Sequence, residues 1–111
     1  MTKEQLRQYR SIKTEVSQME DMLAVYLHAH HIAEDVLHPL ILLYREKLAG
    51  LTEEQLRIER AIESLNPTER TLMRMRYIDG AEWLDICETI HYEWTQTHRI
   101  HARALAKIKN L

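Results

Sequence analysis

The 111-residue chain contains only two glycines, two prolines and one cysteine. A sandwich or barrel of strands needs many tight turns, so the scarcity of Gly and Pro argues against these folds. The abundant Leu, Glu, Arg, Lys, Gln and Ala residues favour helices and predict an all-α protein. A single Cys excludes an internal disulfide, and no apolar run approaches the roughly 20 residues of a membrane-spanning helix, so we expect a cytoplasmic location and no membrane contact.

Charge is unevenly distributed along the chain, whose net charge is −2. Residues 1–66 carry a net charge of −3 and residues 67–111 a net charge of +1, and residues 97–111 contain four Lys or Arg side chains and no acid. A local basic segment of this kind is where a polyanion would bind. Basic residues are also favoured in the last turns of any helix, so charge alone leaves both explanations open.

The first predicted element is a long N-terminal helix. Thr2 followed by Gln5 is the pattern of a capping box, which begins a helix. Residues then recur at alternating steps of three and four, the spacing of heptad a and d positions. Two interpretations stay open: a stripe buried within one monomer, or a helix that pairs with a second copy to form a homodimer. This seam consists of Tyr9, Ile12, Val16, Met19, Leu23, Tyr26, His30, Ala33 and Leu37.

Two breaks are predicted after the seam. Pro39 has no N–H to donate, so it is expected to break or kink the helix. Gly50 is a favourable C-terminal stop, and Thr52 with Gln55 is a capping pattern that opens another helix.

A division into two parts is therefore expected near Gly50. Residues 1–50 are predicted to form a helical arm, with dimerisation as its expected role. Residues 51–111 are predicted to form a compact four-helix domain that contains a helix-turn-helix.

The helices of the second part are predicted from their start and stop signals. Asn66, Pro67 and Glu69 combine a capping residue, a proline at the first helical position and an acid at the third. The predicted elements are a helix ending at about residue 78, a turn at Asp79-Gly80, a helix over residues 82–90, a break near residues 91–92, and a last helix over residues 93–109.

The last two predicted helices have the spacing of a helix-turn-helix. Cys87 is the small residue in the middle of the first helix, and His91 stands where the chain must turn, often through a left-handed residue. Thr97 and Ile100 are the inward residues of the second helix. Two amphipathic helices that simply pack together would show a similar pattern, so that alternative stays open.

Residues 61–108 resemble region 4 of bacterial sigma factors. The motifs that carry the resemblance are a Leu-x-x-x-Glu-Arg stretch at residues 65–70, the Arg76-Tyr77 pair, Gly80 and the late Ala104-Leu105 pair. Residues 98–105, His-Arg-Ile-His-Ala-Arg-Ala-Leu, resemble small phage and prophage late-transcription activators of the RinA-like or ArpU-like type. The resemblance implies a sequence-specific DNA-binding transcription regulator.

The resemblance also implies which side chains meet double-stranded DNA. The helix at about residues 93–109 would lie in the major groove. Arg can form two hydrogen bonds with guanine and Gln with adenine, so Arg99 and Gln96 are the candidates for reading bases. The other expected contacts are Thr95 and His98 to bases or phosphates, Arg103 and Lys107 to phosphates, and Trp94 either to a thymine methyl or as a cover for the turn.

No catalytic, cofactor or metal site is predicted. The chain has no glycine-rich phosphate loop and no nucleophile-and-base signature, which argues against an enzyme. His98 and His101 are three residues apart, as are His28 and His31, but zinc needs three or four ligands and nothing in the sequence completes either pair.

Two other functions fit the same features. An acidic N-terminal half and weak basic character suit a protein-interaction module that binds host RNA polymerase or a sigma factor without reading DNA. A small DNA-packaging (terminase) subunit also combines a helix-turn-helix with oligomerising helices. Salt-dependent binding to duplex DNA would favour the regulator, and a ring-shaped oligomer would favour the packaging subunit.

Overall fold

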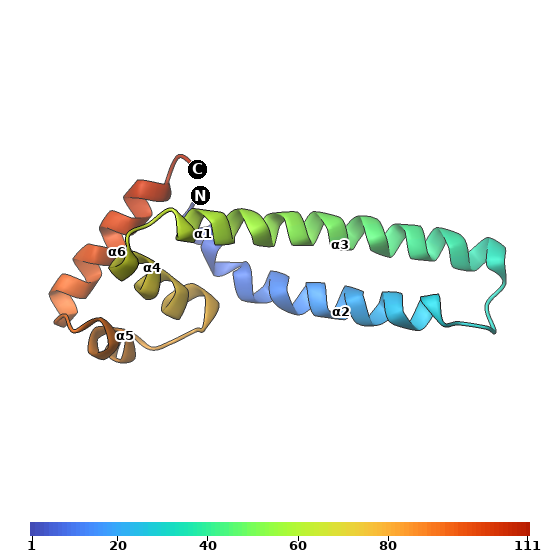
Figure 1. Cartoon of the computed structure of the whole chain (residues 1–111), viewed down its shortest axis with the longest axis horizontal. Coiled ribbons are helices and arrows are strands. Elements are labelled where there is room, and N and C mark those ends of the chain that lie inside the picture. Colours follow the sequence, from blue (N-terminus) through green and yellow to red (C-terminus); the bar gives the residue numbers. More distant parts are fainter. The chain divides into compact units, whose positions relative to one another are not determined.

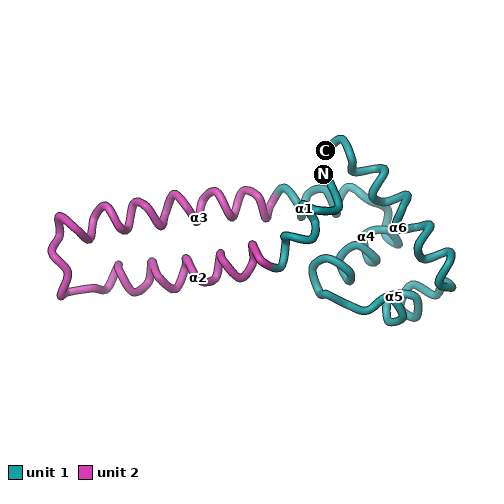
Figure 2. Tube along the Cα trace, turned by 180° about the vertical axis from the view of Figure 1, so that it is seen from behind, with its two compact units in different colours: residues 1–10, 57–111 teal, residues 11–56 magenta.

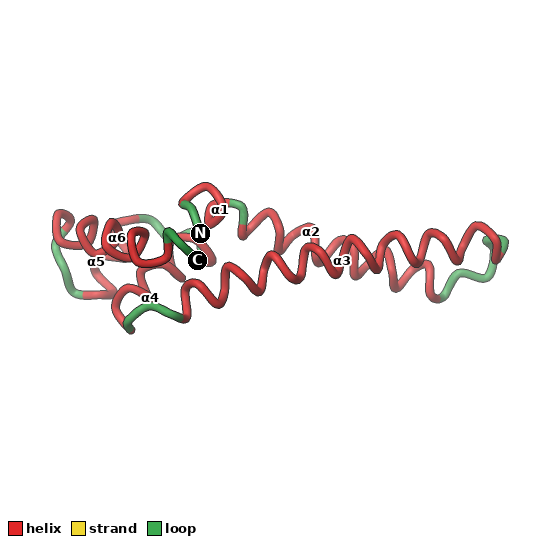
Figure 3. The backbone as a smooth tube through the Cα atoms, turned by 90° about the horizontal axis from the view of Figure 1, so that it is seen from above, coloured by secondary structure: helices red, strands yellow, loops and turns green.

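The computed structural model describes all 111 residues, and every regular element in it is a helix (Figure 1). This confirms the prediction of an all-α protein; Figure 3 shows helices joined by short loops, with no strand. None of the helices combines the length and the apolar character needed to cross a membrane. The elements are α1 (Lys3–Arg7), α2 (Tyr9–Leu27), α3 (Glu34–Glu63), α4 (Pro67–Met73), the π-helical segment η1 (Arg74–Ile78), α5 (Trp83–Ile90) and α6 (Trp94–Ile108).

The chain forms two compact units (Figure 2). We call residues 1–10 together with residues 57–111 the helix-turn-helix unit, and residues 11–56 the hairpin unit. The first ten residues therefore pack with the C-terminal half of the chain, from which they are distant in sequence. The expected division near Gly50 falls inside α3, a helix that continues from one unit into the other.

The hairpin unit consists of two helical stretches that run side by side, with Tyr26 stacked on Tyr44 at a ring-centroid distance of 5.6 Å. The seam from Tyr9 to Leu37 was predicted to lie on one continuous helix. That prediction is wrong, because α2 ends at Leu27 and α3 begins only at Glu34. The residues between them, including His30 and Ala33 of the seam, form the connecting loop.

The breaks predicted at Pro39 and Gly50 are also wrong, because α3 runs through both residues. Pro39 lies close to the start of the helix, where it removes one backbone hydrogen bond of a ladder that continues for many turns beyond it. Gly50 lies in a long helix, where its cost is only about 1 kcal/mol relative to alanine. Thr52 consequently lies within the same helix and does not cap a new one.

The helix starts predicted at Thr2 and at Asn66 are confirmed, and each has a capping box. The Thr2 hydroxyl accepts a hydrogen bond from the Gln5 N–H at 3.2 Å, and the Gln5 side chain accepts one from the Thr2 N–H at 2.7 Å. Asn66 and Glu69 make the same reciprocal pair at 2.9 and 3.2 Å. Each pair satisfies N–H groups that have no partner within the helix.

The helix predicted to end near residue 78 has the expected extent, but its last turn is wider than an α-helical turn. After Met73 the chain continues as η1, and the Asp79 N–H donates to the Arg74 carbonyl at 3.0 Å. The predicted turn follows at Gly80, which has a φ of 71°. A Cβ at Gly80 would lie only 2.5 Å from Nη1 of Arg10, so glycine meets both a conformational and a spatial requirement here.

The core of the helix-turn-helix unit is made by side chains from all of its helices. Its members are fully or almost fully buried and mostly aliphatic, and they join the N-terminal residues to α3, α4, α5 and α6. The largest of them are Leu6, Ile58, Ile62, Leu72, Met73, Ile86 and Ile108.

Candidate nucleic-acid interface

The turn between α5 and α6 is sharp because one residue adopts a left-handed conformation. His91 has φ 61° and ψ 41°, and its N–H donates to the Cys87 carbonyl. The break predicted at residues 91–92 is therefore confirmed, with histidine in a conformation that glycine adopts more readily. The His91 side chain is exposed, so the turn requires no packing partner for it.

The inner face of α6 packs against the rest of the helix-turn-helix unit. Thr97 is completely buried, and its hydroxyl donates a hydrogen bond to the Tyr92 carbonyl at 3.3 Å. This bond satisfies the hydroxyl and ties α6 to the turn that precedes it. Ile100 and Ala104 continue the buried face, and Ile86 of α5 is buried with them, while Cys87 is half-buried.

The outer face of α6 is exposed and carries several of the residues predicted to meet DNA. Thr95, Arg99 and Arg103 are exposed, and neither arginine forms an ion pair with an acid. Gln96 is half-buried at the edge of this face. Trp94, in the first turn, is 51% exposed.

Lys107 has an intramolecular partner. Its ammonium lies 2.8 Å from the carboxylate of Glu69, which is almost completely buried. A buried carboxylate needs a compensating charge or hydrogen bonds, and Glu69 has both, since it also accepts from the Asn66 N–H. Lys107 therefore holds the end of α6 to the start of α4, and its contact with phosphate stays a prediction.

His98 points toward other rings of the unit. Its ring centroid lies 4.3 Å from that of Trp83 and 4.7 Å from that of Trp94. The Nε2 atom of His98 is buried and has no hydrogen-bond partner. The structure thus separates His98 from the exposed Thr95 and Arg99, with which the sequence grouped it.

His101, one turn further on, is buried against Tyr77. The Tyr77 hydroxyl and Nε2 of His101 are 2.7 Å apart. The pKa of His101 is lowered to about 4, chiefly by burial and in addition by the nearby Lys3, His98, Arg76 and Arg7. Burial also raises the pKa of Tyr77. At neutral pH the pair is therefore an uncharged hydrogen bond.

Arg76 and Arg74, both in η1, have different kinds of partner. The Arg76 guanidinium lies 4.8 Å from the Trp83 ring centroid and donates to the Ala81 carbonyl at 3.1 Å. Arg74, in contrast, pairs with Glu59 at 2.7 Å and Glu63 at 3.0 Å.

The sequence did not indicate that Lys3, Arg7 and Arg10 lie close to Arg76 and His101. The only signal was the basic spacing at the N-terminus, where Lys3, Arg7 and Arg10 recur at steps of four and three and so share one side of a helical stretch. No local pattern in the sequence says which other helix that side faces.

The geometry defines an all-helical chain with a helix-turn-helix whose second helix has one buried and one exposed face. Comparison with protein-family models, with curated proteins and with solved structures found no match to this chain. No three His, Cys, Asp or Glu side chains come together in a group able to hold a metal ion.

Proposed function

We propose that this chain is a sequence-specific DNA-binding transcription regulator of the phage late-activator type, acting in the cytoplasm. The observation that carries the proposal is the exposed outer face of α6, on which Arg99 and Arg103 project without acidic partners. In helix-turn-helix proteins the second helix enters the major groove with such a face toward the bases. The sharp turn at His91 supports this use because it holds α6 across α5.

In this proposal, different side chains of α6 contact the bases and the phosphates. Arg99 forms a bidentate pair with a guanine, and Gln96, at the edge of the face, reads a neighbouring adenine. Thr95 and Trp94 lie at the leading end of the helix and meet bases or sugar, while Arg103, one turn beyond Arg99, contacts phosphate.

A dimer formed through the hairpin unit fits the same proposal. Large apolar side chains are exposed on this unit, and a second copy would remove them from water. A dimer with two-fold symmetry would place two recognition helices on half-sites roughly 34–36 Å apart, or a multiple of that distance. The exposed side chains are Val25, Leu27, Val36, Leu42, Leu43 and Leu56.

A second candidate function rests on a different observation. Leu84, in the first turn of α5, is 72% exposed, the largest exposed fraction among the large apolar side chains. An apolar side chain exposed to this extent suits contact with a protein partner such as RNA polymerase or a sigma factor. In this alternative the unit binds the transcription machinery without reading bases.

Binding to duplex DNA at several salt concentrations tests the proposal. The preferred site would first be selected from a random duplex library, and a scrambled duplex would serve as the control sequence. We expect Arg99→Ala to lose about 1–3 kcal/mol of binding free energy on the preferred site and much less on the scrambled one. Arg45→Ala, which removes an exposed arginine from the hairpin unit, is the matched control and should bind as the parent does.

Each alternative result has a definite meaning. Equal losses on both duplexes would show that Arg99 contacts only the backbone. No binding to either duplex at low salt would exclude the regulator, and capture of RNA polymerase that depends on Leu84 would then favour the second candidate.

A further inference from the structure

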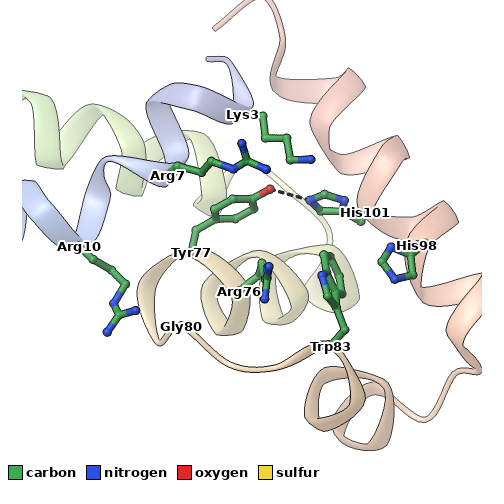
Figure 4. A pocket seen from close by; sticks show the side chains of 9 residues that line it. All are labelled: Lys3, Arg7, Arg10, Arg76, Tyr77, Gly80, Trp83, His98 and His101. Atoms are coloured by element: carbon green, nitrogen blue, oxygen red, sulfur yellow. Dashed lines mark hydrogen bonds between the residues drawn. The ribbon is translucent and has the colours of Figure 1, made fainter.

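The helix-turn-helix unit contains a cavity of about 410 Å³ that the proposed DNA contacts do not use (Figure 4). Three stretches of chain meet there: the first ten residues, the segment from η1 to the start of α5, and α6. The cations around it are Lys3, Arg7, Arg10 and Arg76. None of the residues that line the cavity is acidic.

No acidic side chain lines the cavity to balance Lys3 and Arg76 there. Arg7 pairs with Glu4 at 3.2 Å, but both side chains of that pair are more than half exposed. An exposed pair of this kind contributes little free energy, so Arg7 can turn toward an anion at small cost. Like charges held around one concave space repel one another, and an anion placed among them would relieve that repulsion.

Local contacts hold one of the guanidinium groups in place. Arg76 is fixed by its hydrogen bond to the Ala81 carbonyl and by its contact with Trp83. The site is therefore partly preorganised, which lowers the entropic cost of binding.

The rings of the cavity indicate what kind of anion fits. Trp83 is already in contact with Arg76 at 4.8 Å and His98 at 4.3 Å, and His101 approaches it edge-on at 4.9 Å. These contacts already engage the Trp83 ring, so recognition of an anion rests mainly on charge and on the N–H donors of the cations.

We propose that this cavity binds the di- or triphosphate group of a small soluble compound. Guanidinium and ammonium groups are the side chains that recognise phosphate oxygens most effectively, and the volume lies in the range of small-molecule sites. The site stands apart from the exposed face of α6, so it does not depend on the function proposed for that face. The same phosphate chemistry is present in a DNA backbone, and the experiment below separates the two sources.

The test titrates the full chain with inorganic tripolyphosphate in low salt and follows binding by calorimetry and tryptophan fluorescence. We expect saturable binding with one site per chain, weakened at least about tenfold in the double variant Lys3→Gln/Arg7→Gln, because each cation contributes charge-assisted hydrogen bonds. Both substituted side chains are exposed, so the variant should fold, as circular dichroism would verify. Arg45→Gln is the charge-matched control and should leave binding unchanged.

A second readout reports the site directly. Lys3 and Arg7 face His101 from α1, Tyr77 and Arg76 from η1, Trp83 from α5 and His98 from α6. A bound anion would offset the positive charges that help to hold the pKa of His101 down, so NMR titration should show this pKa rising when tripolyphosphate is present.

Several results would overturn the proposal. One is the absence of saturable binding at millimolar tripolyphosphate; another is equal affinity in the parent and the double variant. A loss of duplex binding in the double variant, with no tripolyphosphate binding by the parent, would assign the cavity to the DNA backbone and reject a small ligand. Retained tripolyphosphate binding by Arg99→Ala, alongside its reduced DNA binding, would support two separate sites.

Discussion

The two units of the chain use apolar residues in opposite ways. In the hairpin unit only Ile12 and Leu23 are buried among the apolar residues, and six large apolar side chains are exposed. In the helix-turn-helix unit, aliphatic side chains from every helix are buried around one core. The comparison shows that one unit has a core of its own, whereas two helices alone bury too little apolar surface and leave large apolar side chains exposed.

Truncating one leucine in each unit gives the largest expected contrast. Leu72 is completely buried, so Leu72→Ala should lower the free energy of unfolding by about 2–5 kcal/mol. Leu42 is 51% exposed, so Leu42→Ala should change it by less than about 0.5 kcal/mol in dilute protein. Urea denaturation at two protein concentrations measures both. If Leu42→Ala costs more only at the higher concentration, the hairpin unit pairs with a second copy; equal costs for the two variants would refute the comparison.

The buried His101 should make the stability of the helix-turn-helix unit depend on pH. The pKa of His101 is about 4 in the folded chain, against an ordinary value of 6.5. Between these values the unfolded chain binds a proton that the folded chain does not, so the free energy of unfolding should fall as pH is lowered from about 6.5 to about 4, by at most about 3 kcal/mol. His101→Gln, which keeps a hydrogen-bonding group toward Tyr77, should flatten this slope. An unchanged slope in the variant would assign the pH dependence to other groups.

A small stabilising effect is expected at Gly50 in the hairpin unit. Gly50 is exposed in the interior of α3, and a Cβ there would meet no atom within 4 Å. Gly50→Ala should therefore raise the free energy of unfolding by about 0.5–1 kcal/mol, because alanine has less backbone freedom to lose. Thermal denaturation would show a higher midpoint. Gly80→Ala is the contrasting variant and should be destabilising, because the φ of 71° at this position is one that a residue with a side chain adopts only with strain.

The parts of the fold that the sequence predicted correctly are those that depend on a few neighbouring residues. The capping boxes at Thr2 and Asn66 and the turn at His91 are of this kind, because each hydrogen bond joins residues three or four positions apart. Pro39 and Gly50 were misread because each weakens a helix locally, and a helix as long as α3 tolerates one lost hydrogen bond and one glycine.

The candidate sites were predictable only in part. The exposed outer face of α6 follows from helical periodicity, which correctly placed Arg99 outward and Thr97 inward. The ion pair between Lys107 and Glu69 and the packing of His98 against Trp83 could not be derived in this way. They join residues of different helices, and so does the ring of cations around the cavity, which depends on how the first ten residues dock within the unit.

The π-helical segment η1 has a consequence for how sequences related to this one should be aligned. A wide turn of this kind accommodates one residue more than an α-helical turn does. A chain lacking one residue within Arg74–Ile78 could close the segment into a regular α-helix, and the residues after it would keep their places in the core, because the wide turn is what absorbs the extra residue. A one-residue gap at this place in an alignment would therefore mark a homologue with the ordinary turn, and its absence would mark one that keeps the bulge.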